Sequence, residues 1–336
     1  MSAGAPDRLR IAALTGALVA GYAASVLFSL LISRPDGHSA SIWPANGFLV
    51  GAMILLGGSW RALAIGLSLG FQVAVSLVVG DGPARALLQP PVNLVEAATV
   101  GALAVRFCGA RDRRLTLGKL GRLLVVAIAP GAMVGGVFGA VLNRALLDEG
   151  LLEGWLAWAV AGGIGTTIVL PTLLLLARTS QYPEFHRSMA ETAALLTGLS
   201  GAAIAVFYQS ELPLLFVLFP SLTLIALRLG PPGAAVACSL VAMICLPLAM
   251  LGHGPVMLAS GLDAVGRVRL AEAMIVAVLV TTLATAGAIA DQARLRRLML
   301  DRDRAVRAAR ARARTAERRL AEHGRDARRG GQARAG

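Results

Sequence analysis

Two polar side chains, Asn93 and Glu96, interrupt a long apolar run over residues 86–107, directly after Pro90-Pro91. They are three residues apart, so they share one face of a helix. A charged side chain at the centre of a membrane span costs ~2.5–3.5 kcal/mol on insertion scales, so it needs a partner or a function. The pair therefore predicts a sensing or proton-linked site, and a protonated or hydrogen-bonded structural glutamate is the alternative.

A second set of polar groups opens the apolar run 42–58, which begins Trp43-Pro44-Ala45-Asn46-Gly47. Pro44 can occupy a first helical turn without losing a hydrogen bond, and Trp43 suits the headgroup zone. Asn46 would lie ~6 Å below the outer membrane surface. These residues form either an interfacial anchor with a helix start or the rim of a ligand site.

Two more polar side chains reach comparable depths on other apolar runs. At ~1.5 Å of rise per residue, Gln72 would lie ~12 Å and Glu272 ~6 Å below the outer surface. Arg228 would lie a further ~15 Å toward the inner face than Glu96, where it reaches the headgroups, so we do not expect the two to pair. The predicted ligand-binding residues are Trp43, Asn46, Gln72, Asn93, Glu96 and Glu272.

The sequence offers no constellation for catalysis or for metal binding. Its histidines are scattered among loops and the tail, and its cysteines lack metal-ligand spacing. These residues are His38, His186, His253 and His323, and Cys108, Cys238 and Cys245. There is no P-loop, H-E-x-x-H, nucleophile elbow or kinase nucleotide motif. We therefore expect no enzyme activity, no metal, no cofactor and no disulfide framework.

Long apolar segments must position these residues. Of 336 residues, 56% are hydrophobic and 15% are charged, and the apolar ones gather in runs. About 20 helical residues cross a ~30 Å hydrocarbon layer, so the pattern predicts an all-α polytopic transmembrane helix bundle of about ten spans. The first is too long for a cleaved signal peptide. The predicted spans are 9–32, 42–58, 60–80, 86–107, 120–142, 154–177, 190–209, 213–229, 231–251 and 268–290.

Basic residues indicate which side of the bundle faces the cytoplasm. With the amino terminus inside, ten Lys or Arg fall in the predicted inner loops, five in the outer loops, and fifteen Arg in the tail from residue 291. The positive-inside rule therefore predicts a multi-pass protein of the bacterial plasma (inner) membrane with both termini cytoplasmic. The net charge of +13 favours anionic lipid headgroups as partner, and we do not expect nucleic acid binding.

The chain divides into four predicted regions. Residues 1–8 are a cytoplasmic tail, 9–290 a membrane domain, 291–322 a basic cytoplasmic helix, and 323–336, rich in Gly, Arg and Ala, a disordered tail. Side chains of the basic helix recur at spacings of three and four: Met299, Arg302, Val306, Ala309, Ala313, Ala316 and Leu320. This spacing fits a dimeric coiled coil, and a solvated or lipid-lying helix is the alternative.

Proline and glycine indicate where helices break or pack closely. Pro90-Pro91 removes two backbone donors and predicts a kinked or interrupted helix. Gly230-Pro231-Pro232 predicts a tight inner turn. Glycines at helical spacing predict close helix contacts rather than a phosphate-binding loop; they are Gly131, Gly135, Gly139, Gly162 and Gly165.

An ordered set of motifs, taken together, resembles a known family. The motifs are Trp43-Pro44-Ala45-Asn46-Gly47, Asn93-x-x-Glu96, Trp158 through Gly165 to Pro171, and Leu212-Pro213 to Phe219-Pro220 followed by Arg228-x-Gly230. Over about residues 10–290 the chain resembles the bacterial membrane-associated sensor domain of the first type, the MASE family.

This resemblance implies an integral membrane sensor that usually precedes histidine kinase, PAS, diguanylate cyclase or phosphodiesterase modules. No such module follows the connecting helix in this sequence, so we expect another protein to supply the output. Members commonly carry an acidic residue three positions before Gly165, where this chain has Gly162. The departure implies a changed or lost ligand contact.

The working hypothesis is a sensor in two-component-like signal transduction. A ligand or membrane partner would shift the bundle between two packings, and the last span would relay the shift to a cytoplasmic or membrane signalling protein, with a homodimer as one form that the tail permits. A small transporter or channel is the rival, although only one broken helix is evident where transporters often have two. A non-sensing membrane scaffold is the third hypothesis.

Overall fold

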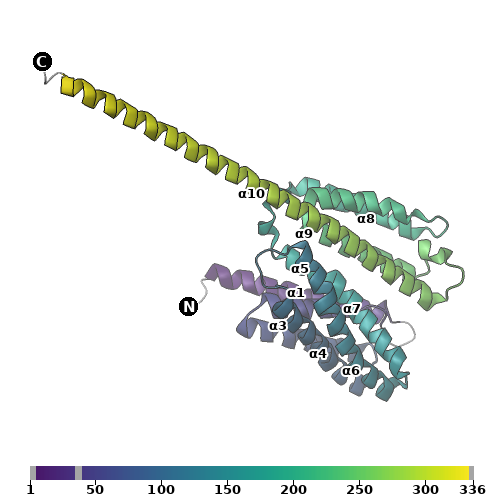
Figure 1. The fold of residues 1–336 in the computed structure, drawn as a ribbon. Coiled ribbons are helices and arrows are strands. Elements are labelled where there is room, and N and C mark those ends of the chain that lie inside the picture. The colour runs from purple at the N-terminus through teal and green to yellow at the C-terminus, as the bar shows by residue number, and fades with distance from the viewer. Residues whose placement is uncertain (1–4, 35–39, 333–336) are drawn as a thin grey trace. The chain divides into compact units, whose positions relative to one another are not determined.

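The computed structural model describes the backbone of residues 5–34 and 40–332, where all regular structure is helical. This confirms the all-α class. The chain forms two compact units, Met1–Ile289 and Ala290–Gly336. In the first unit the helices pack side by side, as α6 and α7 do in Figure 1.

The helices have these bounds: α1 (Ala5–Leu31), α2 (Ala45–Leu55), α3 (Gly58–Val78), α4 (Pro83–Phe107), α5 (Leu117–Arg122), α6 (Ala129–Leu147), α7 (Leu151–Leu176), α8 (Met189–Tyr208), α9 (Leu218–Met250) and α10 (Ala264–Gln332). A π-helical turn, η2 (Leu123–Ile128), joins α5 to α6. It ends two residues before Pro130, which lacks the N–H that would continue the regular pattern of hydrogen bonds.

Seven helices of the described residues are long and apolar enough to cross a membrane. This supports a multi-pass membrane protein, but it does not confirm the predicted count of about ten spans. The helix α4 has the necessary length of 25 residues, but its polar side chains keep it outside the seven. The two spans predicted on either side of Gly230 both lie within α9, which consists of two helical segments that meet at a kink, where the backbone of Gly230 is non-helical (φ 60°, ψ −161°).

The predicted span 42–58 is wrong in length. The helix α2 has 11 residues and is therefore ~16 Å long, about half the hydrocarbon thickness. The backbone leaves the helix at Leu56, which is extended (φ −101°, ψ 154°), and two glycines follow: Gly57 is also extended (φ −118°, ψ 158°) and Gly58 has a φ of 48°. Ile42 and Trp43, which precede it, are not helical.

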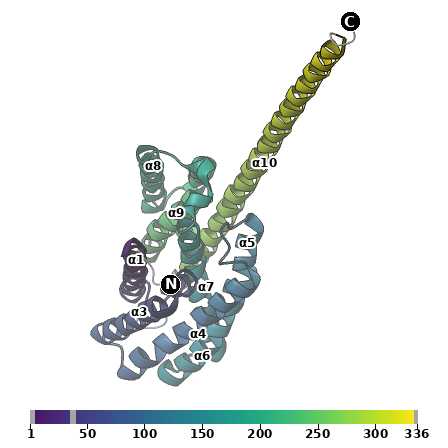
Figure 2. The ribbon, with the colours of Figure 1, turned by 90° about the vertical axis from the view of Figure 1, so that its left-hand side faces the viewer.

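The helix α4 lies between α3 and α6 (Figure 2). Its buried side chains recur every three or four residues and include the polar Gln89, Asn93 and Glu96. The sequence predicted a kinked or interrupted helix, and because α4 is continuous through Pro90-Pro91, the interruption is wrong. Proline's fixed φ is compatible with a helix, so the backbone can continue, although each proline removes one hydrogen bond and crowds the carbonyl four residues earlier, that of Ala86 or Leu87.

The close contacts predicted at the glycines of α6 are confirmed. A Cβ at Gly131 would overlap Val100, one at Gly135 would overlap Glu96, and one at Gly139 would overlap Trp158. Only residues without a side chain allow α4 and α7 to approach α6 this closely. Because α4 and α7 both pack closely on the glycine face of α6, the polar side chains of α4 can reach α7.

In the second unit, the α10 backbone is helical to Gln332, which differs from the disorder predicted over 323–336. Ala and Arg, which are strong helix formers, dominate the helix before Gly330, and no proline interrupts α10. Residues 333–336, and the side chains of Ala313, Ala316 and Leu320, lie outside the described part. Met299 and Val306 of the predicted seam are 66% and 42% exposed, so their apolar side chains are uncovered within the chain. The coiled coil stays a prediction.

Candidate functional site

The polar side chains of α4 face a small cavity that also borders the loop before α2 and the middle of α7. Its lining comprises Ala40, Trp43, Asn46, Gln89, Asn93, Glu96, Trp158, Ala161 and Gly162. About 20 Å³ is open to the centre of a water molecule, which is room for about one water-sized group. Four of the six predicted site residues therefore meet here: Trp43, Asn46, Asn93 and Glu96.

Glu96 is completely buried in the wall of this cavity. Its Oε2 accepts a hydrogen bond from Trp158 Nε1 at 3.0 Å, whereas Oε1 has no partner among the described residues. The carboxamide of Asn46 lies beside the same carboxyl, but neither of its polar atoms makes a hydrogen bond of normal geometry. Gly135 and Gly162 pack so closely on the carboxyl that a Cβ at either would lie under 3.0 Å from it.

Asn93 connects the cavity to a second buried group. Gln72 Oε1 accepts hydrogen bonds from Asn93 Nδ2 at 3.2 Å and from Tyr22 Oη at 2.5 Å. All three side chains are buried. Gln72, a predicted site residue, thus lies behind the cavity wall and holds Asn93 in place rather than facing the cavity.

Glu272 is not brought to this cavity. Its side chain is buried, and its Oε2 accepts a hydrogen bond from Arg269 Nη1 at 3.1 Å. Arg228 forms an ion pair with Glu191 at 3.5 Å, which agrees with the expectation that it does not pair with Glu96. Of the predicted set, Glu272 alone has no described contact with the other members.

The loop before α2 is tied to α1 and α7. The Ile42 carbonyl accepts hydrogen bonds from Ser29 Oγ at 2.9 Å and Ser33 Oγ at 3.2 Å, and the Trp43 N–H donates to the Ala161 carbonyl at 3.0 Å. These bonds draw the loop into the bundle, and Trp43 is only 5% exposed. The Trp43 side chain therefore packs inside the bundle rather than on its surface, and the predicted helix start is observed, because α2 begins at Ala45 directly after Pro44.

Three cavity or network residues were not in the predicted set: Tyr22, Gln89 and Trp158. Each carries a polar atom within an apolar helix, which is costly without a partner. Trp158 lay inside a motif identified in the sequence, and Gln89 directly precedes Pro90-Pro91, so the polarity of both residues was a usable signal. Tyr22 had only its hydroxyl to indicate a buried hydrogen bond, and the sequence does not show that Gln72 is its acceptor.

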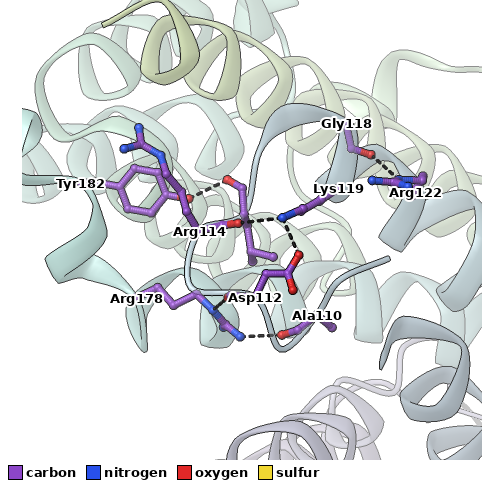
Figure 3. A network of polar contacts seen from close by, with 9 residues as sticks. Ala110, Asp112, Arg114, Gly118, Lys119, Arg122, Arg178 and Tyr182 are labelled. Atoms are coloured by element: carbon purple, nitrogen blue, oxygen red, sulfur yellow. Dashed lines mark hydrogen bonds and ion pairs between the residues drawn. The ribbon is translucent and has the colours of Figure 1, made fainter. Parts of the chain in front are cut away.

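A separate polar network joins the loop after α4 to the loop after α7 (Figure 3). The Arg178 guanidinium donates to three backbone carbonyls, those of Ala110, Asp112 and Leu174. Lys119 forms an ion pair with the Asp112 carboxylate, and this hydrogen bond and charge hold the pKa of Asp112 below its ordinary value. The network fixes the end of the bundle where the sequence predicts the cytoplasmic face.

Replacing Arg178 with lysine is expected to lower the free energy of unfolding by about 1–2 kcal/mol, because an ammonium cannot reach three carbonyls with the geometry of the guanidinium fork. Unfolding in detergent micelles, followed by fluorescence, measures the loss. Arg113→Lys is the matched control, since Arg113 is exposed on the loop after α4 that Arg178 contacts, and it should change stability by no more than about 0.5 kcal/mol. Equal losses in both variants would remove the special role of Arg178.

No group of three His, Cys, Asp or Glu side chains that could hold a metal ion occurs within residues 5–34 and 40–332. The cavity offers hydrogen-bonding groups instead. It combines the indole N–H of Trp43, the carboxamides of Asn46 and Gln89 and the carboxyl of Glu96. Such a set can orient a small polar group, but it contains no nucleophile paired with a base.

A comparison with protein-family models gives one match. The model described as MASE1 matches residues 12–294, which include every residue that lines the cavity. No curated protein and no solved structure is similar enough to match the chain.

Proposed function

The chain belongs to the MASE1 family of membrane domains, and from this premise we propose that it is a membrane sensor: its outer cavity binds a small polar group, and its last helix relays the change to a partner protein. We propose a binding role and no catalytic one. Glu272, which does not line the cavity, is left out of the proposed ligand contacts.

Unpartnered polar atoms around the cavity carry this proposal. Trp43 Nε1, both polar atoms of Asn46, Gln89 Oε1 and Glu96 Oε1 are buried without hydrogen-bond partners among the described residues. Each unsatisfied group costs about 1–3 kcal/mol, so a ligand that supplies both donors and acceptors recovers that cost on binding. The small volume favours a group of hydroxyl or amine size.

A path for the relay is available within the first unit. The helix α4 leads from Glu96 to the loop fixed by Arg178, and that loop leads to Leu117 at the start of α5. Leu117 contacts Gly287 of α10, where a Cβ would lie 3.1 Å from the Leu117 Cβ. A change in the packing of α4 would thus reach α10 before residue 290, and a partner would read it through the basic helix beyond.

Ligand binding can be tested on the full chain in nanodiscs. We expect a panel of small hydroxylated and aminated compounds to contain one that raises the thermal unfolding midpoint. Asn46→Ala should abolish that rise, whereas Asn143→Ala, which removes a buried carboxamide outside the cavity, should retain it. Flux of the same compound into proteoliposomes would favour the transporter, and no compound with this dependence on Asn46 would contradict the ligand site.

We further propose that both termini lie in the cytoplasm, because the basic loops and tail favour that side. Cysteines introduced at Arg113 and Asp148, both exposed and on opposite predicted sides, test this. A membrane-impermeant maleimide added to intact cells should label Asp148→Cys alone and should label Arg113→Cys only after permeabilisation. The reverse pattern would place the termini outside.

A further inference from the structure

An apolar cavity of about 290 Å³ lies beside the polar one, between α1, α2, α7 and α9. Two of its walls present side chains at helical spacing, Ala24 and Phe28 from α1 and Ser239, Ala242 and Met243 from α9. Its volume is about twice that of an apolar cavity that binds benzene. It is therefore large enough to hold part of a flexible hydrocarbon chain.

The cavity opens onto the lipid-facing side of the bundle. The helix α1 packs on α2 and α3, whereas α9 packs on α7 and α8, so α1 and α9 leave a gap between them. Ala24 is exposed and Met243 is 56% exposed, while Ile168 and Ala242 are 4% and 2% exposed. In a membrane domain such exposed apolar side chains face lipid, so the cavity runs from the lipid-facing surface to buried residues.

The chemistry of the lining selects against a charged occupant. None of the residues that line the cavity is Asp, Glu, Lys, Arg or His. Its most polar pair is already satisfied, because the hydroxyls of Thr172 and Ser239 lie 3.0 Å apart and both donate to the Ile168 carbonyl, at 3.0 and 3.2 Å. A headgroup would gain nothing inside, whereas methylene groups would lose no hydrogen bond by entering.

The two cavities share one wall, the loop before α2. Ile42 and Pro44 line the apolar cavity, and Trp43 lines the polar one. The backbone between them is held by the hydrogen bond from the Trp43 N–H to the Ala161 carbonyl. An occupant that presses on Ile42 and Pro44 therefore acts directly on the position of the Trp43 indole.

We infer that the apolar cavity receives one acyl chain of a bilayer phospholipid, which enters between α1 and α9 and packs against Ile42 and Pro44. The bilayer supplies such chains at high local concentration, and the uncharged lining leaves the headgroup outside. Occupancy then sets the position of Trp43, so lipid composition tunes the polar cavity. This last consequence rests on the proposed function, whereas binding of the acyl chain does not.

Photolabelling tests the binding directly. The full chain is placed in nanodiscs of phosphatidylcholine that carries a diazirine in one acyl chain, irradiated, and mapped by peptide mass spectrometry. We expect adducts on Ile168 or Ala242, which lipids at the bundle surface do not reach. Ala24→Phe should fill the mouth and lower these adducts about fivefold or more. Ala17→Phe, also exposed on α1 but outside the cavity, should leave them unchanged.

Met243→Trp, on the opposite side of the mouth, repeats the test should Ala24→Phe fail to elute as a folded protein. Adducts confined to exposed residues, or reduced equally by Ala24→Phe and Ala17→Phe, would overturn the inference. A diazirine-labelled free fatty acid in unlabelled nanodiscs is the other arm. Labelling of Ile168 by the fatty acid alone would overturn the assignment to phospholipid. Because photolabelling reads only the apolar cavity, its failure leaves the test of ligand binding at Asn46 standing.

Discussion

Gly165→Ala is expected to lower the free energy of unfolding by about 3 kcal/mol, because its new Cβ would lie under 3.0 Å from the carbonyl group of Trp43 and from the nitrogen of Pro44. These are backbone atoms, so no change of rotamer relieves the overlap. The loop has to move away from α7, which breaks the hydrogen bond from the Trp43 N–H to the Ala161 carbonyl. Unfolding in detergent micelles, followed by fluorescence, measures the loss.

The same substitution should also abolish the response to ligand, because this loop carries Trp43 and leads into Asn46. Gly70→Ala is the control, since a Cβ at Gly70 of α3 meets nothing within 4 Å. There alanine should be neutral or stabilise the helix by up to about 1 kcal/mol. Gly163→Ala, on α7 itself, meets only Ala132 Cβ at 3.3 Å and should cost less than Gly165→Ala. Equal stability of all three variants would contradict the close docking of the loop.

The interior face of α4 could be predicted from the sequence because helical periodicity is a local property. Gln89, Asn93 and Glu96 are spaced three or four apart, and the cost of exposing them to lipid directs that face inward. The glycines of α6 could be predicted for the same reason, since their spacing of four places them on one side of the helix. Both patterns need no knowledge of which helix lies opposite.

The length of α2 was missed because hydropathy measures an apolar run and not a helix. Residues 42–58 are apolar enough for a span, but Ile42 and Trp43 are not helical, and their backbone groups form hydrogen bonds with α1 and α7 instead. The Gly57-Gly58 pair was a usable signal for the carboxyl end of this helix. The partners of the loop are distant in sequence, so its position could not be predicted.

Glu272 was predicted to lie beside the cavity residues because its depth in the membrane was calculated from the helical rise per residue alone. The rise per residue gives the height of a side chain in the membrane, but not its position around the bundle. Glu272 was predicted to lie at nearly the same height as Asn46, yet it bonds Arg269 on its own helix. Gln72 was placed near Asn93 by the same arithmetic, and there the two helices are neighbours.

Removing the carboxyl of Glu96 is the second change for which we expect a large effect. Glu96→Met keeps an unbranched side chain of similar length but offers no good acceptor, so Trp158 Nε1 becomes a buried donor without a partner. We expect a loss of about 2 kcal/mol in the free energy of unfolding and no response to ligand. Glu96→Gln keeps an acceptor for the indole and should cost less than about 1 kcal/mol.

Glu272→Gln separates the role of the Glu96 carboxyl from the effect of removing any buried carboxyl. Glu272 is also buried, but it does not line the cavity. Its substitution should leave the ligand-induced rise in the unfolding midpoint intact, whatever it costs in stability. If Glu272→Gln abolished the response and Glu96→Met did not, the site would lie elsewhere.

The cause of the loss at Glu96 can be assigned with a double-mutant cycle. Trp158→Phe removes the indole donor, so Glu96→Met in that background should cost about 1–2 kcal/mol less than in the native chain. Such coupling would attribute the cost to the hydrogen bond between Trp158 and Glu96. Additive losses would instead attribute the loss to packing of the Glu96 side chain against Gly135 and Gly162. The carboxyl of Glu96 would then only fill space, and its proposed hydrogen-bonding role in the cavity would be wrong.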